Sequence, residues 1–218
     1  MNELLFAARK IKKSFGGRTI FFDVNFKLGN QDGLGIVGKN GAGKSTLAKI
    51  IAAVLSPTEG EITVEMEGEK LAQARRFEFV GFVAPYLQLY DEFSAWENLD
   101  IFRRIRRLPV SDEQLMDLLE RVGLAEWKSY HVRTYSSGMK QRLKYASALL
   151  HQPPVLILDE PMSNLDSEGI DIVNKIMKEQ IDQGSLVVAT NEKKDLQFCR
   201  QILDLDIYAS GKLMVKKL

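Results

Sequence analysis

Residues 38–45, which read Gly-Lys-Asn-Gly-Ala-Gly-Lys-Ser, constrain the fold of this chain more than any other segment. They fit the pattern G-x-x-x-x-G-K-[ST] at every fixed position, between an apolar run at 34–37 and a helical pattern at about 46–54. Glycines let the backbone curl so that successive N–H groups point at phosphate oxygens, and the following helix presents its positive end to the same anion. The segment therefore predicts a phosphate-binding loop between a strand and a helix.

Two side chains of this predicted loop are suited to chemistry on phosphates. Lys44 can neutralise the β- and γ-phosphates of a nucleotide, and the Ser45 hydroxyl can ligate Mg²⁺. The pattern alone does not separate ATPases, GTPases and small-molecule kinases. The other residues of the segment that we expect to contact a nucleotide are Gly38, Lys39, Asn40, Gly41, Ala42, Gly43 and Thr46.

A second candidate site is an acidic pair at the end of an apolar run. Residues 155–158 read Val-Leu-Ile-Leu and are followed directly by Asp159 and Glu160. Charges at the tip of a buried strand need a partner, because burying them unpaired is expensive. Mg²⁺ would supply that partner, with Asp159 holding the metal directly or through water. Glu160 would orient and deprotonate an attacking water.

The order of apolar patterns along the chain predicts the fold class. Apolar runs at 4–11 and 20–28 precede the loop, and buried-strand patterns alternate with helical ones after it. Such alternation predicts an α/β fold with a largely parallel sheet and antiparallel strands at its start. The other expected elements are a strand or hairpin at 60–68, strands at 79–85 and 185–190, helices at 136–150 and 168–182, and a closing hairpin at 202–218.

The segment from about 91 to 130 differs from its surroundings, because its apolar residues recur at helical spacing. Pro109 separates two expected helices, and Ser-Asp-Glu-Gln at 111–114 predicts a capping box for the second. The sequence therefore predicts a helical insert, at about 88–140, within the α/β core.

Composition excludes several classes of protein. The 218 residues suit one domain, and a formal net charge of +1 argues against a protein that grips nucleic acid by its phosphates, so no nucleic-acid partner is expected. The single cysteine excludes an internal disulfide framework and a cysteine-built zinc site. No apolar run approaches the ~18 residues needed to span a bilayer, and the N-terminal residues do not match a signal peptide. A cytoplasmic protein is expected.

Residues 135–142, Tyr-Ser-Ser-Gly-Met-Lys-Gln-Arg, place serines and a glycine at a helix start, which predicts a second anion site. Here the chain resembles the nucleotide-binding subunits of ABC (ATP-binding cassette) transporters, whose signature reads LSGGQ followed by basic residues. Ser137 stands at the first glycine position of that signature and Met139 at the glutamine position. Residues 163–166, Ser-Asn-Leu-Asp, resemble the D-loop of the same family, and the resemblance covers essentially the whole chain.

The resemblance implies a P-loop NTPase (RecA-like) core with an N-terminal antiparallel β subdomain and the inserted helical subdomain, in a single domain at 1–218. It implies ATP and Mg²⁺ as cofactors. It also implies a head-to-tail dimer with a second cassette, either an identical chain or a paralogue, in which each ATP lies between the loop of one chain and the signature of the other.

The resemblance assigns further nucleotide-contacting roles. Phe15 stands where the family stacks an aromatic ring on adenine, and Asp166 belongs to the segment like the D-loop. Ser136, Ser137 and Gly138 would contact the γ-phosphate of the nucleotide held by the partner.

Two positions depart from the family pattern. The family has a metal-sensing glutamine after the strand that ends near Ala84, but the aligned position holds Pro85 and Gln88 follows three residues later. We take Gln88 as the candidate metal-site residue. The family also has a histidine that touches the γ-phosphate, where this chain has Asn191. An amide donates a hydrogen bond but carries no charge and shuttles no proton, so we expect slower or differently regulated hydrolysis.

The resemblance implies an ATP-hydrolysing transporter subunit that works with a separate integral membrane permease at the cytoplasmic membrane. Among such subunits, the chain looks most like exporter-type cassettes. One alternative is an ABC ATPase that acts on nucleic acid or ribosomes. A basic groove would favour that alternative, whereas a non-polar groove beside the helical insert would favour a membrane partner. The other is a GTPase, because residues 166–169 match D-x-x-G and residues 191–195 almost match N-K-x-D.

Overall fold

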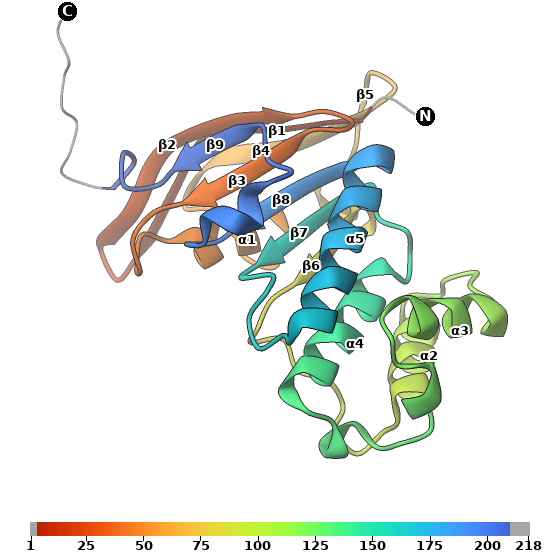
Figure 1. Cartoon of the computed structure of the whole chain (residues 1–218). Helices are drawn as coiled ribbons and strands as arrows, with labels where there is room; N and C mark the ends of the chain where they lie inside the picture. Colours follow the sequence, from red (N-terminus) through yellow and green to blue (C-terminus); the bar gives the residue numbers. More distant parts are fainter. Residues whose placement is uncertain (1–3, 210–218) are drawn as a thin grey trace, which may run out of the picture.

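The computed structural model of the chain describes residues 4–209, apart from the side chain of residue 74. Its described part contains two sheets, one of four strands in the order β2-β1-β4-β5 and one of five strands in the order β6-β7-β8-β3-β9 (Figure 1). The first sheet is antiparallel and the second is parallel throughout. The expected α/β class, with antiparallel strands at the start of the chain, is confirmed.

The antiparallel sheet is built on a long hairpin. Strand β1 (Leu4–Phe15) pairs with β2 (Arg18–Leu28) on one side and with β4 (Glu59–Met66) on the other. Strand β4 pairs in turn with the short antiparallel strand β5 (Glu69–Lys70). The hairpin turns at Gly16 and Gly17, both with positive φ, where a side chain would strain the backbone. Strand β1 is longer than the run expected at 4–11. The sequence pattern ends early because the second half of the strand alternates only partly between buried and exposed residues.

The parallel sheet is almost completely buried at its centre. Every residue of β7 and β8 is buried, as expected for parallel strands that are covered on both faces. The five strands are β3 (Gly33–Val37), β6 (Val80–Val83), β7 (Val155–Asp159), β8 (Ser185–Ala189) and β9 (Gln201–Asp204). The sequence predicts a hairpin at 202–218, but the first part of this segment is strand β9, which pairs in parallel with β3. Residues 210–218 lie outside the described part.

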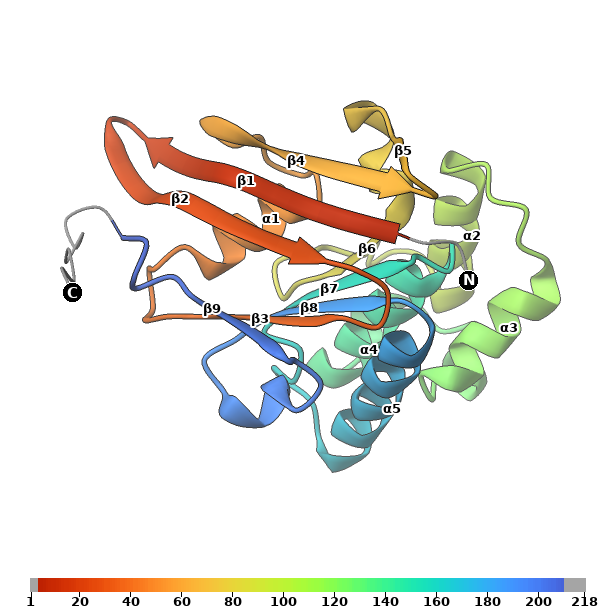
Figure 2. The same cartoon turned by 90° about the horizontal axis from the view of Figure 1, so that it is seen from above.

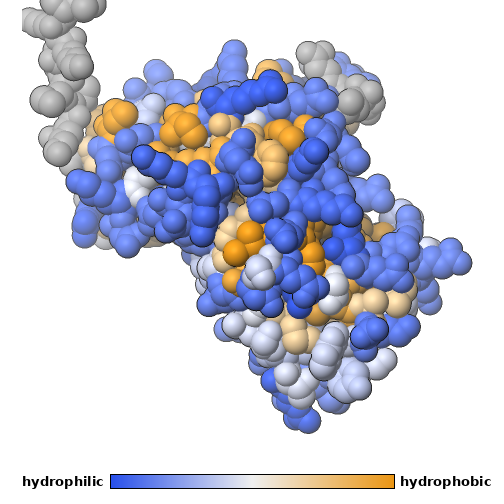
Figure 3. All heavy atoms as spheres, viewed as in Figure 1, coloured by the Kyte–Doolittle hydropathy of each residue, from blue (hydrophilic) through white to orange (hydrophobic). Residues whose placement is uncertain are grey.

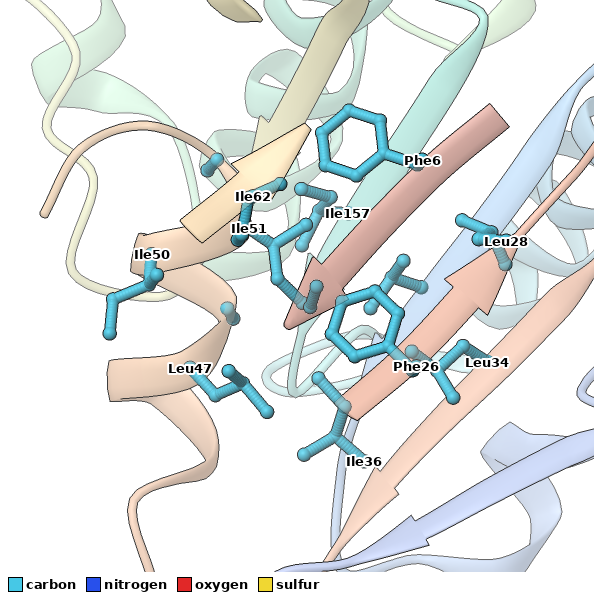
Figure 4. Packing of buried hydrophobic residues seen from close by; sticks show 14 of the residues in the cluster. Phe6, Phe26, Leu28, Leu34, Ile36, Leu47, Ile50, Ile51, Ile62 and Ile157 are labelled. Carbon is cyan, nitrogen blue, oxygen red and sulfur yellow. The ribbon is translucent and has the colours of Figure 1, made fainter. Parts of the chain in front are cut away.

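Helix α1 (Lys44–Ile51) lies between the two sheets, and Figure 2 shows β2, β1 and β4 side by side above it. Its buried residues Leu47, Ile50 and Ile51 pack against side chains from both sheets, as Figure 4 shows. The helix begins two residues earlier than the sequence pattern indicated and ends at Ile51, not near Val54. This core fixes where the helix begins, and therefore where the loop before it lies.

The other face of the parallel sheet is covered by α4 (Ser137–Leu149) and α5 (Ser167–Gln183). Alternate residues of one strand serve the two cores, since Ile157 packs toward α1 and Leu156 and Leu158 pack toward α4 and α5. The short 3₁₀ helices are η1 (Gln73–Phe79), η2 (Ala125–Trp127), η3 (Val132–Thr134) and η4 (Lys193–Leu196).

The helical insert is present. Helices α2 (Ala95–Ile105) and α3 (Asp112–Arg121) lie to one side of the sheets in Figure 1 and pack on α4. The capping box expected at 111–114 is confirmed, with Ser111 and Gln114 each accepting from the other's backbone N–H. Ser94 and Glu97 form the same arrangement at the start of α2. None of the described helices has the length and apolarity needed to cross a bilayer.

Candidate functional site

The candidate residues meet because parallel strands end at one edge of the sheet. Asp159, the last residue of β7, is paired with Ala189 of β8, and Ala189 lies opposite Ile36 of β3. The residues that follow these strands are therefore Glu160, Thr190 and the loop beginning at Gly38. In an open α/β sheet, ligands bind at the carboxyl ends of the strands, which is this edge.

The loop at 38–43 adopts a conformation that needs its glycines. Gly38, Gly41 and Gly43 all have positive φ, at 142°, 85° and 103°. A Cβ at Gly43 would lie 2.6 Å from the Ile20 side chain, so any side chain there would force the neighbouring side chains of β2 to shift. At Gly41 a Cβ would meet nothing, so this glycine is required by backbone conformation alone.

The start of α1 lacks the capping that the other α-helices have. Its N-cap is Gly43, with no side-chain cap and no acidic residue in the first turn. Helices α2, α3, α4 and α5 are instead capped by the side chains of Ser94, Ser111, Ser136 and Asp166. Uncapped N–H groups and a positive helix end form a natural anion site.

Lys44 points its ammonium group into the loop. The side chain is buried, and its Nζ donates to the Gly38 carbonyl at 2.9 Å and to the Lys39 carbonyl at 3.4 Å. Both acceptors are neutral, and no ion pair of Lys44 is found in residues 4–209, although its charge acts on the nearby carboxylates of Asp159 and Glu160. A phosphate in the loop would supply the missing negative charge.

Asp159 is 1% exposed, and two residues that carry hydroxyl groups lie beside its carboxylate. They are Ser45, in the first turn of α1, and Tyr86, in the loop after β6. Its Oδ1 atom is buried without a hydrogen-bond partner. Burial raises the pKa of Asp159, whereas the neighbouring hydroxyls of Ser45 and Tyr86 and the charges of Lys49 and Lys44 lower it.

The donor set around Asp159 fits Mg²⁺. Mg²⁺ is bound by oxygen ligands and keeps several waters, so one carboxylate, one hydroxyl and phosphate oxygens suffice. The unpartnered Oδ1 atom and the neighbouring Ser45 hydroxyl are such ligands. Among residues 4–209, no cluster of three or more His, Cys, Asp or Glu side chains could hold a metal without such additional ligands.

Glu160 directly follows β7 in a strained backbone conformation. Its φ of 50° is in the left-handed region, which costs a non-glycine residue about 1–3 kcal/mol, and its N–H donates to the Ala189 carbonyl at 2.8 Å. Its Oε2 lies 3.5 Å from the Thr190 hydroxyl. Burial raises the pKa of Glu160, and the negative charges of Asp159 and Asp195 act in the same direction, whereas Lys44 lowers it. A carboxylate with a raised pKa at this edge is suited to accept a proton from water.

Asn191 contacts the phosphate-binding loop directly. Its Nδ2 donates to Oδ1 of Asn40 at 2.7 Å, across 151 positions of the sequence. Next to it, the Thr190 hydroxyl donates to Asp195 at 2.7 Å. Asp195 is 2% exposed and is thus a buried support of the segment after β8.

The signature-like segment forms the start of α4. The Ser136 hydroxyl accepts from the Met139 N–H at 3.1 Å, so Ser136 acts as a helix cap, while Ser136 and Ser137 are both exposed. A Cβ on Gly138 would lie 3.0 Å from the Asn164 carbonyl, so this glycine allows the segment at 163–166 to approach α4 closely. Asp166 caps α5 by accepting from the Gly169 N–H.

Phe15 and Gln88 are exposed at the surface. Phe15 is 49% exposed at the end of β1, with the Lys13 ammonium 4.7 Å from its ring centre. An exposed ring can stack on a base. Gln88 lines a groove beside the helical insert, and the loop residue whose pKa is raised by burial and then by the charge of Asp159 is Tyr86.

The groove has a volume of about 350 Å³ and is largely apolar. Phe77 and Val54 on its wall are 52% and 62% exposed. Arg106 donates to the Phe77 carbonyl at 3.1 Å and lies 3.0 Å from His151. The lining residues come from the end of α1, η1, β6 and the loop after it, α2 and α4: Ala52, Val54, Phe77, Val80, Gly81, Phe82, Leu87, Gln88, Leu89, Phe102, Arg106, Lys144, Ser147, Ala148 and His151.

Elsewhere the surface is more polar. The face drawn in Figure 3 is largely hydrophilic, with hydrophobic residues showing as separate patches over the sheets and between the sheets and the helices.

Neither Tyr86 nor Thr190 is among the residues predicted from the sequence, and Asp195 is considered only in the guanine-binding alternative. A signal for Tyr86 existed, because it follows the end of β6, and β6 pairs with β7 in parallel so that Val83 lies opposite Leu158. A polar residue shortly after β6 is therefore expected near Asp159. The contact between Thr190 and Asp195 depends on the path of the chain after β8, for which the sequence offers no comparable pattern.

Comparison with known proteins agrees with this geometry. The family model described as ABC transporter matches residues 21–163. An uncharacterised ABC transporter ATP-binding protein of Bacillus subtilis, YybJ, is 32% identical over all of this chain and 99% of its own length. The lantibiotic transport ATP-binding protein SrtF of Streptococcus pyogenes is 32% identical over 96% of this chain and 89% of its own.

Solved structures show the same fold. The ATP-binding subunit of an ABC transporter superposes with a TM-score of 0.80 at 25% identity, covering 92% of this chain and 85% of that one. The dimeric cassette MJ0796, in a post-hydrolysis state with ADP and Pi, has a TM-score of 0.78 at 24% identity, covering 91% of this chain and 93% of its own. This chain therefore belongs to the ABC transporter family, as an ATP-binding cassette with ATPase function.

Proposed function

We propose that this cassette hydrolyses Mg·ATP between two cassettes and drives export through a separate membrane-embedded subunit. The observation that carries the proposal is the convergence of the uncapped loop, Lys44, Asp159 and Glu160 at one edge of the sheet. We also propose that residues 1–218 form one domain, which works at the cytoplasmic face of the membrane.

ATP binding rests on the loop and its neighbours. The N–H groups of 38–46 and the Lys44 ammonium would surround the β- and γ-phosphates, and Phe15 would stack on the adenine. Ser45 and Asp159 would hold Mg²⁺, which supplies neutralisation of the phosphate charge. The uncapped start of α1 and the unpartnered Oδ1 atom of Asp159 support these assignments.

Glu160 is the proposed general base. Its carboxylate would orient a water molecule and take a proton from it as the water attacks the γ-phosphate. The raised pKa of Glu160 brings its proton affinity closer to that needed for this task at neutral pH. Asn191, held against Asn40, would keep the loop in position and donate to the γ-phosphate region without carrying charge.

A second cassette is needed because the two anion-binding elements of one chain lie apart. In Figure 1 the start of α4, with Ser136, Ser137 and Gly138, is at the lower end of the molecule, well away from α1 and the end of β3. We therefore infer that a nucleotide at the loop of one chain is contacted by the start of α4 of another chain. A head-to-tail dimer would bring the α4 start of one chain to the phosphates of the other, and Asp166 would stand beside that interface. The dimeric state of the solved cassette MJ0796 supports this arrangement.

Replacing Asn191 with histidine is expected to raise the rate of ATP hydrolysis several-fold. Histidine keeps a donor at this position and adds a group that titrates near neutral pH. The steady-state rate of phosphate release measures the effect, with Asn174→His on α5 as a control, since Asn174 bonds to Gln197 at 2.7 Å, outside the edge of the sheet. If Asn191→His hydrolyses ATP no faster than the wild type, the amide is not what limits the rate.

The membrane partner is proposed to dock in the groove. The groove lies beside the helical insert and is largely apolar, with Arg106 and Lys144 among its lining, so it fits an amphipathic segment that carries an acidic residue. Export is supported by relatives whose names include linearmycin resistance and cytochrome c biogenesis export.

Replacing Phe77 with aspartate is expected to weaken binding to the membrane subunit by tenfold or more, because a charge would enter an apolar contact. The cassette would be co-expressed with a candidate multi-span membrane protein from a neighbouring gene, and its recovery in the detergent-purified complex would be measured. Ile207→Asp, at a residue 66% exposed outside the groove, is the matched control. Equal recovery of Phe77→Asp and wild type would place the partner elsewhere.

The alternatives have less support. Guanine recognition by residues 191–195 would need an accessible Asp195 carboxylate, but Asp195 is buried against Thr190. A cassette that acts on nucleic acid or ribosomes would be expected to have a basic groove, whereas the groove beside the insert is largely apolar.

A further inference from the structure

Glu160, the proposed general base, is held in a backbone conformation that its place in the sequence disfavours. Its φ of 50° is in the left-handed region, and it precedes Pro161, before which the chain is normally extended. Such a conformation persists only where the surrounding structure imposes it. The contacts of the peptide groups around Glu160 therefore decide where its carboxylate lies.

Part of this constraint comes from the turn that follows β7. The Glu160 N–H donates to the Ala189 carbonyl at 2.8 Å, and the Glu160 carbonyl accepts from the Ser163 hydroxyl at 2.9 Å. The next residue, Pro161, is buried and has no N–H, so its carbonyl is the only backbone group through which a hydrogen bond can hold it. A buried carbonyl without a partner is costly, so this group needs a donor.

Tyr145, on α4, supplies that donor. Its hydroxyl donates to the Pro161 carbonyl at 2.9 Å, and its side chain is completely buried. A phenylalanine would fill the same space apart from one oxygen atom, so packing alone does not require the hydroxyl. A buried tyrosine hydroxyl is expected to have a specific partner, and here the partner is the residue next to the proposed base.

Helix α4 is a firm support for this contact. Leu143 of α4 lies in the same buried cluster as Leu158 of β7, so the helix is packed on the strand that ends before Glu160. The start of α4 also approaches the turn closely, since a Cβ on Gly138 would lie 3.0 Å from the Asn164 carbonyl. The turn after β7 is thus held against α4 near both of its ends.

We propose that Tyr145 is a positioning residue for Glu160, which it holds through the Pro161 carbonyl. The inference rests on the proposed function, since it assigns a support to the base of that site. Without the hydroxyl, the Pro161 peptide can rotate and the strained backbone of Glu160 can relax toward an extended conformation. The carboxylate then lies away from the attacking water, so hydrolysis slows. The phosphate-binding loop follows a different strand, β3, and keeps its affinity for nucleotide.

The test compares Tyr145→Phe with the wild type in steady-state phosphate release and in ADP affinity by calorimetry. We expect kcat to fall about five- to thirtyfold, because a 1 Å misplacement can cost about 100-fold, while KM for ATP and Kd for ADP change less than twofold. Ser185→Ala is the matched control, because it removes a buried hydroxyl that donates to the Gly29 carbonyl at 2.6 Å, at the start of β8. The control should lower the unfolding temperature by a similar amount and leave kcat unchanged.

A double-variant cycle separates positioning of the base from a general structural role. In the Glu160→Gln background, where no base remains, Tyr145→Phe should change the residual single-turnover rate less than twofold. An unchanged kcat in Tyr145→Phe, a fall in kcat shared by Ser185→Ala, or the same fall within the Glu160→Gln background would each overturn the proposal. A Glu160→Gln variant that hydrolyses ATP like the wild type would instead overturn the proposed function, which is a separate result.

Discussion

Replacing Glu160 with glutamine is expected to lower ATP hydrolysis by about 10²–10⁴-fold while ATP binding is retained. Glutamine has nearly the shape of glutamate but cannot accept the proton of an attacking water. The local backbone structure should be retained, because the backbone N–H of residue 160 still donates to the Ala189 carbonyl. Phosphate release measures the rate, and equilibrium binding of ATP measures the retained affinity.

The pH dependence of hydrolysis provides an independent check on the same residue. Burial raises the pKa of Glu160 above its ordinary value of 4.5, so the protonated, inactive form accumulates at a higher pH than for an exposed glutamate. Hydrolysis by the wild type should therefore fall as pH decreases through the raised pKa. Glu120→Gln, an exposed change on α3, should keep both the rate and the pH profile. A Glu160→Gln variant with more than a tenth of wild-type activity would exclude Glu160 as the base.

Replacing Lys44 with alanine is expected to weaken ATP binding by about 100-fold or more. A charge-assisted hydrogen bond contributes about 1.5–3 kcal/mol, and the described hydrogen bonds of this buried ammonium go only to neutral carbonyls of the loop. The fold should persist, because Lys44 bonds only to the carbonyls of Gly38 and Lys39 in its own loop. Calorimetric titration with ATP measures the affinity, and thermal unfolding checks the fold.

The matched control for Lys44→Ala is Lys178→Ala, on the exposed face of α5. It removes the same charge and the same side-chain length outside the loop, so its ATP affinity should equal that of the wild type. If Lys44→Ala binds ATP as tightly as Lys178→Ala does, the loop does not hold the phosphates through this lysine.

The residues that could be predicted from the sequence are those whose geometry is local. The loop at 38–45 specifies its own backbone through glycines, and the helix start after it places Lys44 and Ser45 without reference to distant segments. Asp159 could be predicted because an apolar strand ends there, and parallel strands end at a shared edge. The capping box at 111–114 is local in the same sense.

The residues that could not be predicted depend on contacts through space. Asn191 meets Asn40 across 151 positions, and nothing near either residue in the sequence signals the pair. The position of Gln88 on the groove wall depends on how the loop after β6 turns, which the sequence does not specify. Strand β9 was read as part of a hairpin because its parallel partner, β3, lies far away in the sequence.

The central claim is that ATP closes two cassettes through the loop of one chain and the start of α4 of the other. The protein for the test is the Glu160→Gln variant, which should hold ATP without turnover. Its control is the double variant that also carries Ser137→Glu, at the first residue of α4. An acid there favours the helix, because it faces the positive helix end, but it would repel the phosphates of the partner's ATP.

The most direct measurement is the molar mass of these proteins in solution at saturating Mg·ATP, by light scattering after gel filtration. The account predicts that Glu160→Gln has twice the monomer mass with Mg·ATP and the monomer mass without it, and that the added Ser137→Glu restores the monomer. A Glu160→Gln protein that binds Mg·ATP and stays monomeric, or a dimer that is indifferent to Ser137→Glu, would contradict it.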